Sequence, residues 1–170
     1  MTDGYGRKID YMRISLTDNC NLRCSYCMPE GKISDIHYLT AETVLKCVES
    51  AVCLGITNFR LTGGEPLIYP DIEKLITKMR NVSGVNFIGI TTNGVFLSEK
   101  ADVLKTAGTD SINVSLDTID SDEFRKITGH SCLRNVIDGI DGRDFREHVS
   151  HMGRSVVTIT GDKFLFCHFS

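Results

Sequence analysis

The pattern of apolar and polar residues predicts strands and helices that alternate along the chain. Short apolar runs typical of buried strands occupy residues 11–17, 58–62, 85–91 and 111–116. Segments with apolar residues at helical spacing occupy residues 41–54, 72–79, 99–107, 122–127 and 132–140. Strands joined by helices of this length must run parallel, with right-handed crossovers. The pattern therefore predicts an α/β fold with about four β/α units, arranged as an incomplete parallel barrel or an open sheet.

Polar residues that favour helix N-caps precede four of these helices. We expect Thr40, Asp71, Ser98 and Ser121 to be the N-cap residues, because their side-chain oxygens can accept from the first backbone N–H groups.

Every polar motif follows the end of a predicted strand. The motifs are a cysteine loop at 20–27, Gly-Gly-Glu-Pro at 63–66, Thr-Thr-Asn-Gly at 91–94 and Ser-Leu-Asp at 115–117. The carboxyl ends of parallel strands share one rim, which is where α/β folds build their sites. We expect one shared site there, although Asn93-Gly94 taken alone is more typical of a simple turn.

Three cysteines stand at C-x3-C-x2-C spacing in the first of these motifs. Cys20, Cys24 and Cys27 can bring three thiolates to one point. An iron–sulfur cluster with three cysteine ligands would keep one iron open. A structural zinc site would need a fourth ligand, for which His37 is the nearest imidazole, and buried unreactive thiols are a third interpretation.

Composition limits the classes of function. The 170 residues are 41% hydrophobic and carry a net charge of −3, which suits one soluble domain and gives no sign of nucleic-acid binding or a membrane patch. We find no membrane span and no secretory signal, so seven cysteines predict a reducing, cytoplasmic location.

Several longer strings carry a family resemblance. They are 11–20 with the cysteine loop and Met28-Pro29, 60–67 (RLTGGEPL), 91–94 (TTNG), 112–118 (INVSLDT) and 124–129 (FRKITG). Together they resemble the radical S-adenosylmethionine (SAM) superfamily and, within it, the GTP 3',8-cyclase family of molybdenum cofactor biosynthesis. The implied fold is an incomplete (β/α) barrel of the radical SAM type.

The resemblance implies roles for particular residues. Cys20, Cys24 and Cys27 would hold a [4Fe–4S] cluster whose open iron is chelated by SAM. Tyr26, Gly64, Glu65 and Ser115 would contact SAM. Arg13, Arg60 and Thr91 would contact GTP, since buried guanidinium groups need an anionic partner. The alternative for the arginines is an interior carboxylate such as Asp117 or Glu65.

The implied reaction is that of a lyase. An electron donor reduces the cluster, SAM yields a 5'-deoxyadenosyl radical, and GTP becomes (8S)-3',8-cyclo-7,8-dihydroguanosine 5'-triphosphate. The alternatives are a non-catalytic metal-binding or interaction module and a different radical SAM activity.

The resemblance ends near residue 140, which predicts a partial radical SAM core over 1–140 and a divergent tail over 141–170. We expect a truncated or frame-shifted chain of doubtful full activity. Runs at 155–160 and 163–169 flank Gly161-Asp162 and predict a β-hairpin. The hairpin could cover the open sheet edge or promote association, as a homo-oligomer or with a partner chain.

Overall fold

The protein's computed structural model describes residues 2, 4–27 and 37–140, and the strands at 155–160 and 163–168. The predicted irregular segment at 28–36 and the tail at 141–154 lie outside the described residues.

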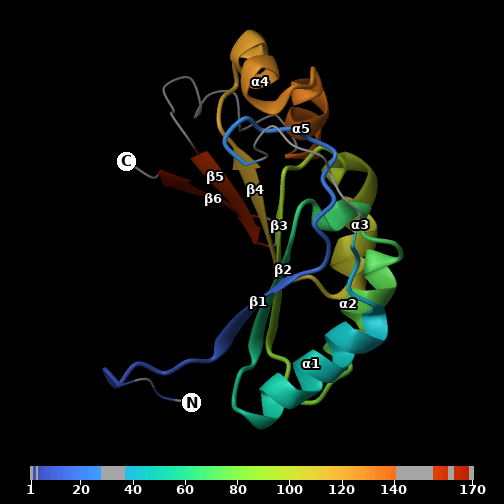
Figure 1. Ribbon diagram of the computed structural model, residues 1–170, viewed down its shortest axis with the longest axis vertical. Helices are drawn as coiled ribbons and strands as arrows, with labels where there is room; N and C mark the ends of the chain where they lie inside the picture. The colour runs from blue at the N-terminus through green and yellow to red at the C-terminus, as the bar shows by residue number, and fades with distance from the viewer. Residues whose placement is uncertain (1, 3, 28–36, 141–154, 161–162, 169–170) are drawn as a thin grey trace.

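Four parallel strands form the larger part of the sheet, with β1 at its edge (Figure 1). They are β1 (Tyr11–Ser15), β2 (Asn58–Thr62), β3 (Phe87–Thr92) and β4 (Ser111–Leu116). Each strand pairs with the next in chain order, so the predicted parallel α/β arrangement is confirmed. Strand β3 begins two residues later than predicted, because Val85 belongs to a turn in which its N–H donates to Val82 O at 3.2 Å.

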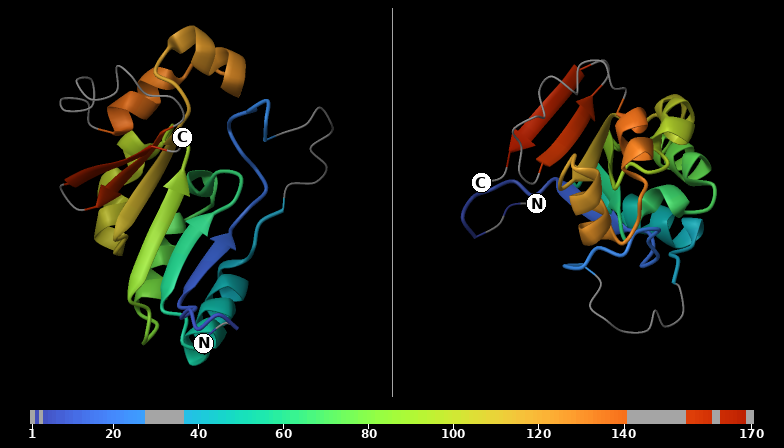
Figure 2. Two further views of the ribbon diagram at one scale, coloured as in Figure 1. Left: turned by 90° about the vertical axis from the view of Figure 1, so that its left-hand side faces the viewer. Right: turned by 90° about the horizontal axis from the view of Figure 1, so that it is seen from above.

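Helices cover one face of this sheet. They are α1 (Ala41–Cys53), α2 (Ile72–Arg80), α3 (Leu97–Ala107), α4 (Ser121–Thr128) and α5 (Leu133–Gly139), with a short 3-10 turn η1 (Pro66–Ile68). Figures 1 and 2 show α1, α2 and α3 side by side along the sheet, with α4 and α5 near the carboxyl ends of the strands. Neighbouring parallel strands in chain order with helices on one side are the winding of a β/α barrel, here incomplete.

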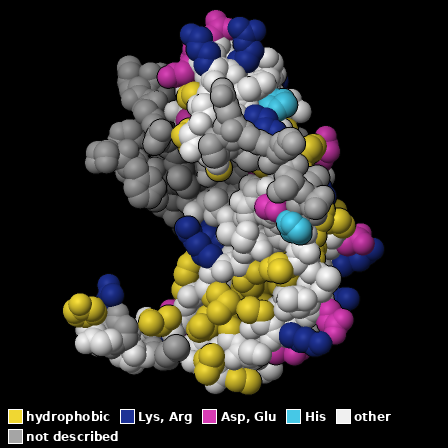
Figure 3. All heavy atoms as spheres, viewed as in Figure 1, with side chains coloured by type: hydrophobic (Ala, Val, Ile, Leu, Met, Phe, Trp, Pro, Cys, Tyr) yellow, Lys and Arg dark blue, Asp and Glu magenta, His cyan; other side chains and the backbone are white. Residues whose placement is uncertain are grey.

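The two faces of the sheet differ in chemistry because side chains alternate along each strand. The face toward the helices is apolar and buried, as shown by Phe59, Leu61, Ile88, Ile90 and Val114 with no exposed area. The opposite face, which we call the polar face, presents Tyr11, Arg13, Arg60, Gly89, Thr91, Asn113 and Ser115. Figure 3 shows the surface hollowed on this side, with Lys or Arg side chains at the margin.

Two of the predicted helix caps stand at the expected position. Thr40 caps α1, and its hydroxyl accepts from Thr43 N at 3.1 Å. Asp71 is the N-cap residue of α2, but its side chain makes no capping hydrogen bond and instead accepts from Lys74 Nζ at 3.0 Å.

The other two cap predictions are wrong. Helix α3 begins at Leu97, so Ser98 lies inside its first turn and Phe96 is the N-cap residue. Helix α4 begins at Ser121 itself. The preceding Asp120 caps it with a carboxylate that accepts from two backbone N–H groups, because Asp120 stands one residue before the helix and its backbone is extended.

The hairpin predicted after residue 154 forms two antiparallel strands. They are β5 (Ser155–Thr160) and β6 (Lys163–His168), with the predicted turn at 161–162 outside the described residues. Strand β5 pairs antiparallel with β4, so the hairpin lies along one edge of the parallel sheet.

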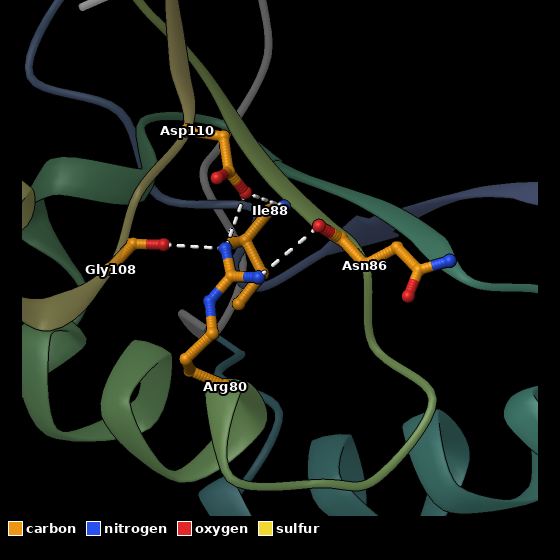
Figure 4. Close-up of polar contacts among 5 residues, drawn as sticks. All are labelled: Arg80, Asn86, Ile88, Gly108 and Asp110. Atoms are coloured by element: carbon orange, nitrogen blue, oxygen red, sulfur yellow. Dashed lines mark hydrogen bonds and ion pairs between the residues drawn. The ribbon is translucent and has the colours of Figure 1, made fainter.

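An arginine ties elements together at the amino ends of β3 and β4 (Figure 4). Arg80 donates to Gly108 O at 2.6 Å and to Asn86 O at 3.3 Å, and it forms an ion pair with Asp110. Asp110 also accepts from Ile88 N at 2.7 Å. These contacts lie at the end of the strands opposite the polar motifs, where side chains of α/β folds serve stability.

Candidate active site

The polar motifs meet at the carboxyl ends of the strands, as predicted. Gly64 N donates to Thr17 O at 2.7 Å, and Glu65 N donates to Asn19 O at 2.8 Å. Asn93 Nδ2 donates to Asn21 Oδ1 at 2.8 Å. The cysteine loop, the Gly-Gly-Glu-Pro motif and the Thr-Thr-Asn-Gly motif are therefore one connected structure.

The glycine pair allows the backbone of the cysteine loop to pass close by. A Cβ atom on Gly64 would lie 2.0 Å from Asn19 O, and one on Gly63 would lie 2.4 Å from Thr17 O. Gly63 also has a φ of 141°, which side chains rarely adopt. The close neighbouring backbone therefore explains why position 64 is a glycine in this chain. That SAM also approaches Gly64 closely stays a prediction.

Glu65 is the most deeply buried acidic side chain of the site, with 1% of its surface exposed. Its carboxylate accepts from Leu67 N at 2.9 Å, from Thr92 Oγ1 at 2.6 Å and from Asn93 N at 2.8 Å. Burial raises its pKa, and these three donors oppose the rise without cancelling it. The carboxylate is held in one orientation beside the cysteine loop.

The three cysteines of the loop differ in exposure. Cys20 and Cys24 are half-buried, and Cys27 is exposed. Burial raises the pKa of the Cys20 thiol, the N–H of Leu22 lowers it, and the charge of Glu65 raises it again. Burial is also the main cause that raises the pKa of the Cys24 thiol. The charge of Cys27 also raises the pKa of the Cys20 thiol, and the charges of Cys20 and Cys27 raise the pKa of the Cys24 thiol.

Helix α4 holds the outer side of the cysteine loop. Arg23 N donates to Thr128 O and Ser25 N donates to Ile127 O, both at 2.9 Å. These backbone bonds join the loop after β1 to a helix about a hundred residues later in the sequence. Nothing in the local sequence of the loop indicates this contact.

Tyr26 makes a second link to the fourth strand–helix unit. Its hydroxyl donates to Asp117 Oδ2 at 2.6 Å, just after the end of β4. Burial and then the Asp117 carboxylate raise the pKa of Tyr26. Tyr26 as a residue is 59% exposed, so it remains available to a ligand at the rim.

The loop fits a cluster by the chemistry of its donors. Within the part of the chain that the structure describes, no three Cys, His, Asp or Glu side chains stand in a ready metal-binding arrangement, and His37 completes no such set. Metal sites are rarely preformed without their metal. Three cysteines on one loop, with Cys27 exposed and the loop held from outside, are the type of side chain that binds an iron–sulfur cluster once deprotonated.

Two arginines predicted to contact GTP lie side by side on the polar face. Arg13 and Arg60 are register partners on β1 and β2. Arg13 is exposed, whereas Arg60 is only 9% exposed. Neither pairs with a carboxylate among the residues described, so their proposed pairing with Asp117 or Glu65 is not present.

Further along the polar face, two buried polar atoms lack hydrogen-bond partners. Thr91 Oγ1 and Asn113 Oδ1 belong to register partners on β3 and β4, and neither has a partner in the described structure. Ser115, two residues beyond Asn113, is exposed on the same face. Asn113 was not among the predicted site residues, although its two-residue spacing from Ser115 places both on one face of the strand.

This combination of a parallel sheet, a three-thiol loop after its first strand and a polar rim has a counterpart among known proteins. The profile of the radical SAM superfamily matches residues 14–163, most of the chain, and the chain therefore belongs to that superfamily. Membership implies a [4Fe–4S] cluster and SAM as cofactors.

More specific relatives share one name. The chain is 48% identical over 143 residues to GTP 3',8-cyclase of Clostridium acetobutylicum, which covers 83% of this chain and 45% of the relative. It is 38% identical over 175 residues to GTP 3',8-cyclase of Lactiplantibacillus plantarum, which covers 99% of this chain and 52% of the relative. The chain thus spans about half the length of these curated relatives. Similarity extends past residue 140, further than the motifs indicated.

A solved structure has a similar fold. BtrN in complex with AdoMet and 2-DOIA matches with a TM-score of 0.53 and 20% identity, over 62% of this chain and 45% of that one. The likeness supports the radical SAM type of incomplete barrel. None of the helices that the structure describes is long and apolar enough to span a bilayer.

Proposed function

We propose that this chain forms the cluster- and SAM-binding part of a GTP 3',8-cyclase, acting in a reducing compartment such as the cytoplasm. The proposal rests chiefly on one observation. The residue immediately before the three-thiol loop is hydrogen-bonded directly to the motif that carries a buried, oriented glutamate, with Glu65 N donating to Asn19 O at 2.8 Å. Ligands of a cluster and an acceptor for an ammonium group are thereby fixed next to each other. The similarity to curated GTP 3',8-cyclases supports the choice of reaction.

Each residue has a task in this proposal. Cys20, Cys24 and Cys27 hold the cluster. Glu65 accepts from the ammonium group of SAM, and Tyr26 and Ser115 bind the rest of that molecule at the rim. When bound, the reduced cluster and SAM together supply a 5'-deoxyadenosyl radical.

Arg13, Arg60 and Thr91 bind GTP on the polar face. Guanidinium groups bind phosphate oxygens in a bidentate way, and the two arginines have no carboxylate partner among the described side chains. The hydroxyl of Thr91, buried without a partner, can donate to the substrate. These groups orient GTP toward the rim where SAM binds.

Anaerobic reconstitution with iron and sulfide tests the cluster site. We expect wild type to gain four irons and to absorb broadly at about 400 nm, as thiolate-ligated iron–sulfur clusters absorb. Cys20→Ser, Cys24→Ser and Cys27→Ser should each lose most of this absorption. Cys47→Ser and Cys53→Ser, at exposed positions of α1, are matched controls and should retain it. A colourless protein that binds one zinc instead would show that the loop is a structural metal site.

Product analysis tests the reaction itself. Reconstituted protein supplied with dithionite and SAM should release 5'-deoxyadenosine, and addition of GTP should yield the 3',8-cyclised product. Cleavage of SAM without any change in GTP would restrict the proposal to a radical SAM core that acts on another substrate.

A further inference from the structure

Tyr11 stands between the two arginines of the polar face. Its hydroxyl oxygen accepts from Arg60 Nε at 3.0 Å and from Arg13 Nε at 3.4 Å. Tyr11 and Arg13 are two residues apart on β1, and Arg60 is the register partner of Arg13 on β2. One phenol oxygen therefore holds two guanidinium groups on the same side of the sheet.

Arg60 is held from three further directions. Its Nη1 donates to Ile90 O at 3.2 Å, and its Cζ lies 5.8 Å from the centre of the Phe87 ring. Gly89 leaves the space that the guanidinium fills, because a Cβ atom there would lie 2.9 Å from both Cζ and Nη2. The guanidinium thus lies over β3, with its Nη2 not engaged by any described partner.

The charges of this pair call for an anion. Like charges on neighbouring strands repel each other, and a guanidinium as buried as Arg60 is costly without a counter-charge. A hydroxyl oxygen that accepts from both groups offsets part of this cost and keeps their remaining N–H groups free for a ligand. A polyphosphate, with several charged oxygens, could bridge both guanidinium groups at once.

We propose that Tyr11 is a positioning residue that sets the two arginines for the polyphosphate chain of a nucleoside triphosphate. The inference rests on the proposed function, because it concerns the same GTP site. It adds that Tyr11 strengthens ligand binding more as the ligand carries more phosphates, because Tyr11 positions the arginines that bind them. Tyr11 contacts the arginines and not the reacting atoms.

Equilibrium binding of a phosphate series to wild type and Tyr11→Phe tests this role. The probes are guanosine, GDP, GTP, ATP and inorganic tripolyphosphate, each with the reconstituted protein at fixed ionic strength. Phenylalanine keeps the ring and removes the acceptor, so we expect about tenfold weaker binding of GTP and tripolyphosphate, a smaller loss for GDP and no change for guanosine. Tyr5→Phe, at an 88% exposed ring of the N-terminal segment, is the control and should match wild type.

Gly89→Ala supplies an independent second variant. Its methyl group should displace the end of Arg60 and weaken triphosphate binding in the same graded way, without touching Tyr11. Thermal unfolding of each variant is measured to check that the fold is intact.

Equal affinity of wild type and Tyr11→Phe for GTP would overturn the inference, as would a loss of the same size for guanosine. Failure of the proposed function would give different results from failure of this inference. If tripolyphosphate binding depends on Tyr11 but GTP binds no better than ATP, the positioning role holds and guanine specificity is lost. If wild type binds no polyphosphate, the inference fails, while cluster assembly and SAM cleavage remain to be judged by their own assays.

Discussion

Glu65 is a buried carboxylate whose position depends on donors from two different motifs. Leu67 N comes from its own motif, whereas Thr92 Oγ1 and Asn93 N come from the end of β3. Its location in a Gly-Gly-Glu-Pro string indicates a site, but its burial and its three donors depend on how β2 and β3 lie together. At the residue scale, sequence predicts which side chain matters better than it predicts the environment of that side chain.

The raised pKa of Glu65 makes a prediction about pH. The folded state binds this proton up to a higher pH than the unfolded state does, since the pKa lies above its ordinary 4.5. The contribution of Glu65 to stability is therefore complete below about 4.5 and falls as the pH rises through the folded pKa. We expect the free energy of unfolding of wild type, relative to Glu65→Gln, to decrease as the pH rises above about 4.5 in urea denaturation. Glu49→Gln, at an exposed position of α1, is the control. A difference in the free energy of unfolding that grows with pH would mean that the three donors lower the pKa of Glu65 by more than burial raises it.

At the scale of elements, helices and strands followed from the spacing of apolar residues, whereas their exact ends did not. The start of α4 shows why. Asp120 and Ser121 are both good cap residues, and only the extended backbone of Asp120 lets its carboxylate reach two N–H groups. The contact of α4 with the cysteine loop is likewise invisible locally, because it joins Arg23 to Thr128 through backbone atoms.

The Arg80 contacts give a prediction at this scale. Glutamine at position 80 is too short to reach Gly108, Asn86 and Asp110 together, and it leaves Asp110 without its cation. We expect Arg80→Gln to lower the free energy of unfolding by about 1–3 kcal/mol, measured by urea denaturation. Lys78→Gln, at an exposed position of the same helix, should change it by less than about 0.5 kcal/mol. Equal losses in the two variants would show that the contacts at the amino end of the sheet do not stabilise the fold.

At the scale of the whole molecule, the β5–β6 hairpin decides how the sheet ends. It pairs antiparallel with β4, so β4 has a neighbour on each side, as β3 does. We expect amide hydrogen exchange in β4 to be about as slow as in β3, because both strands donate to neighbours along their full length. Fast exchange over 111–116, with slow exchange over 87–92, would contradict the pairing of β4 with β5.

The order of strands and helices, the three-thiol loop and the motifs after each strand were determined by the sequence itself. Each depends on spacing over a few residues, and parallel pairing then places every motif at one rim. The tertiary structure alone decided which partners these residues have: the donors to Glu65, the α4 contact behind the cysteines, and the phenol between two arginines. Such contacts join residues far apart in sequence, and their geometry depends on register and packing, which no local pattern specifies.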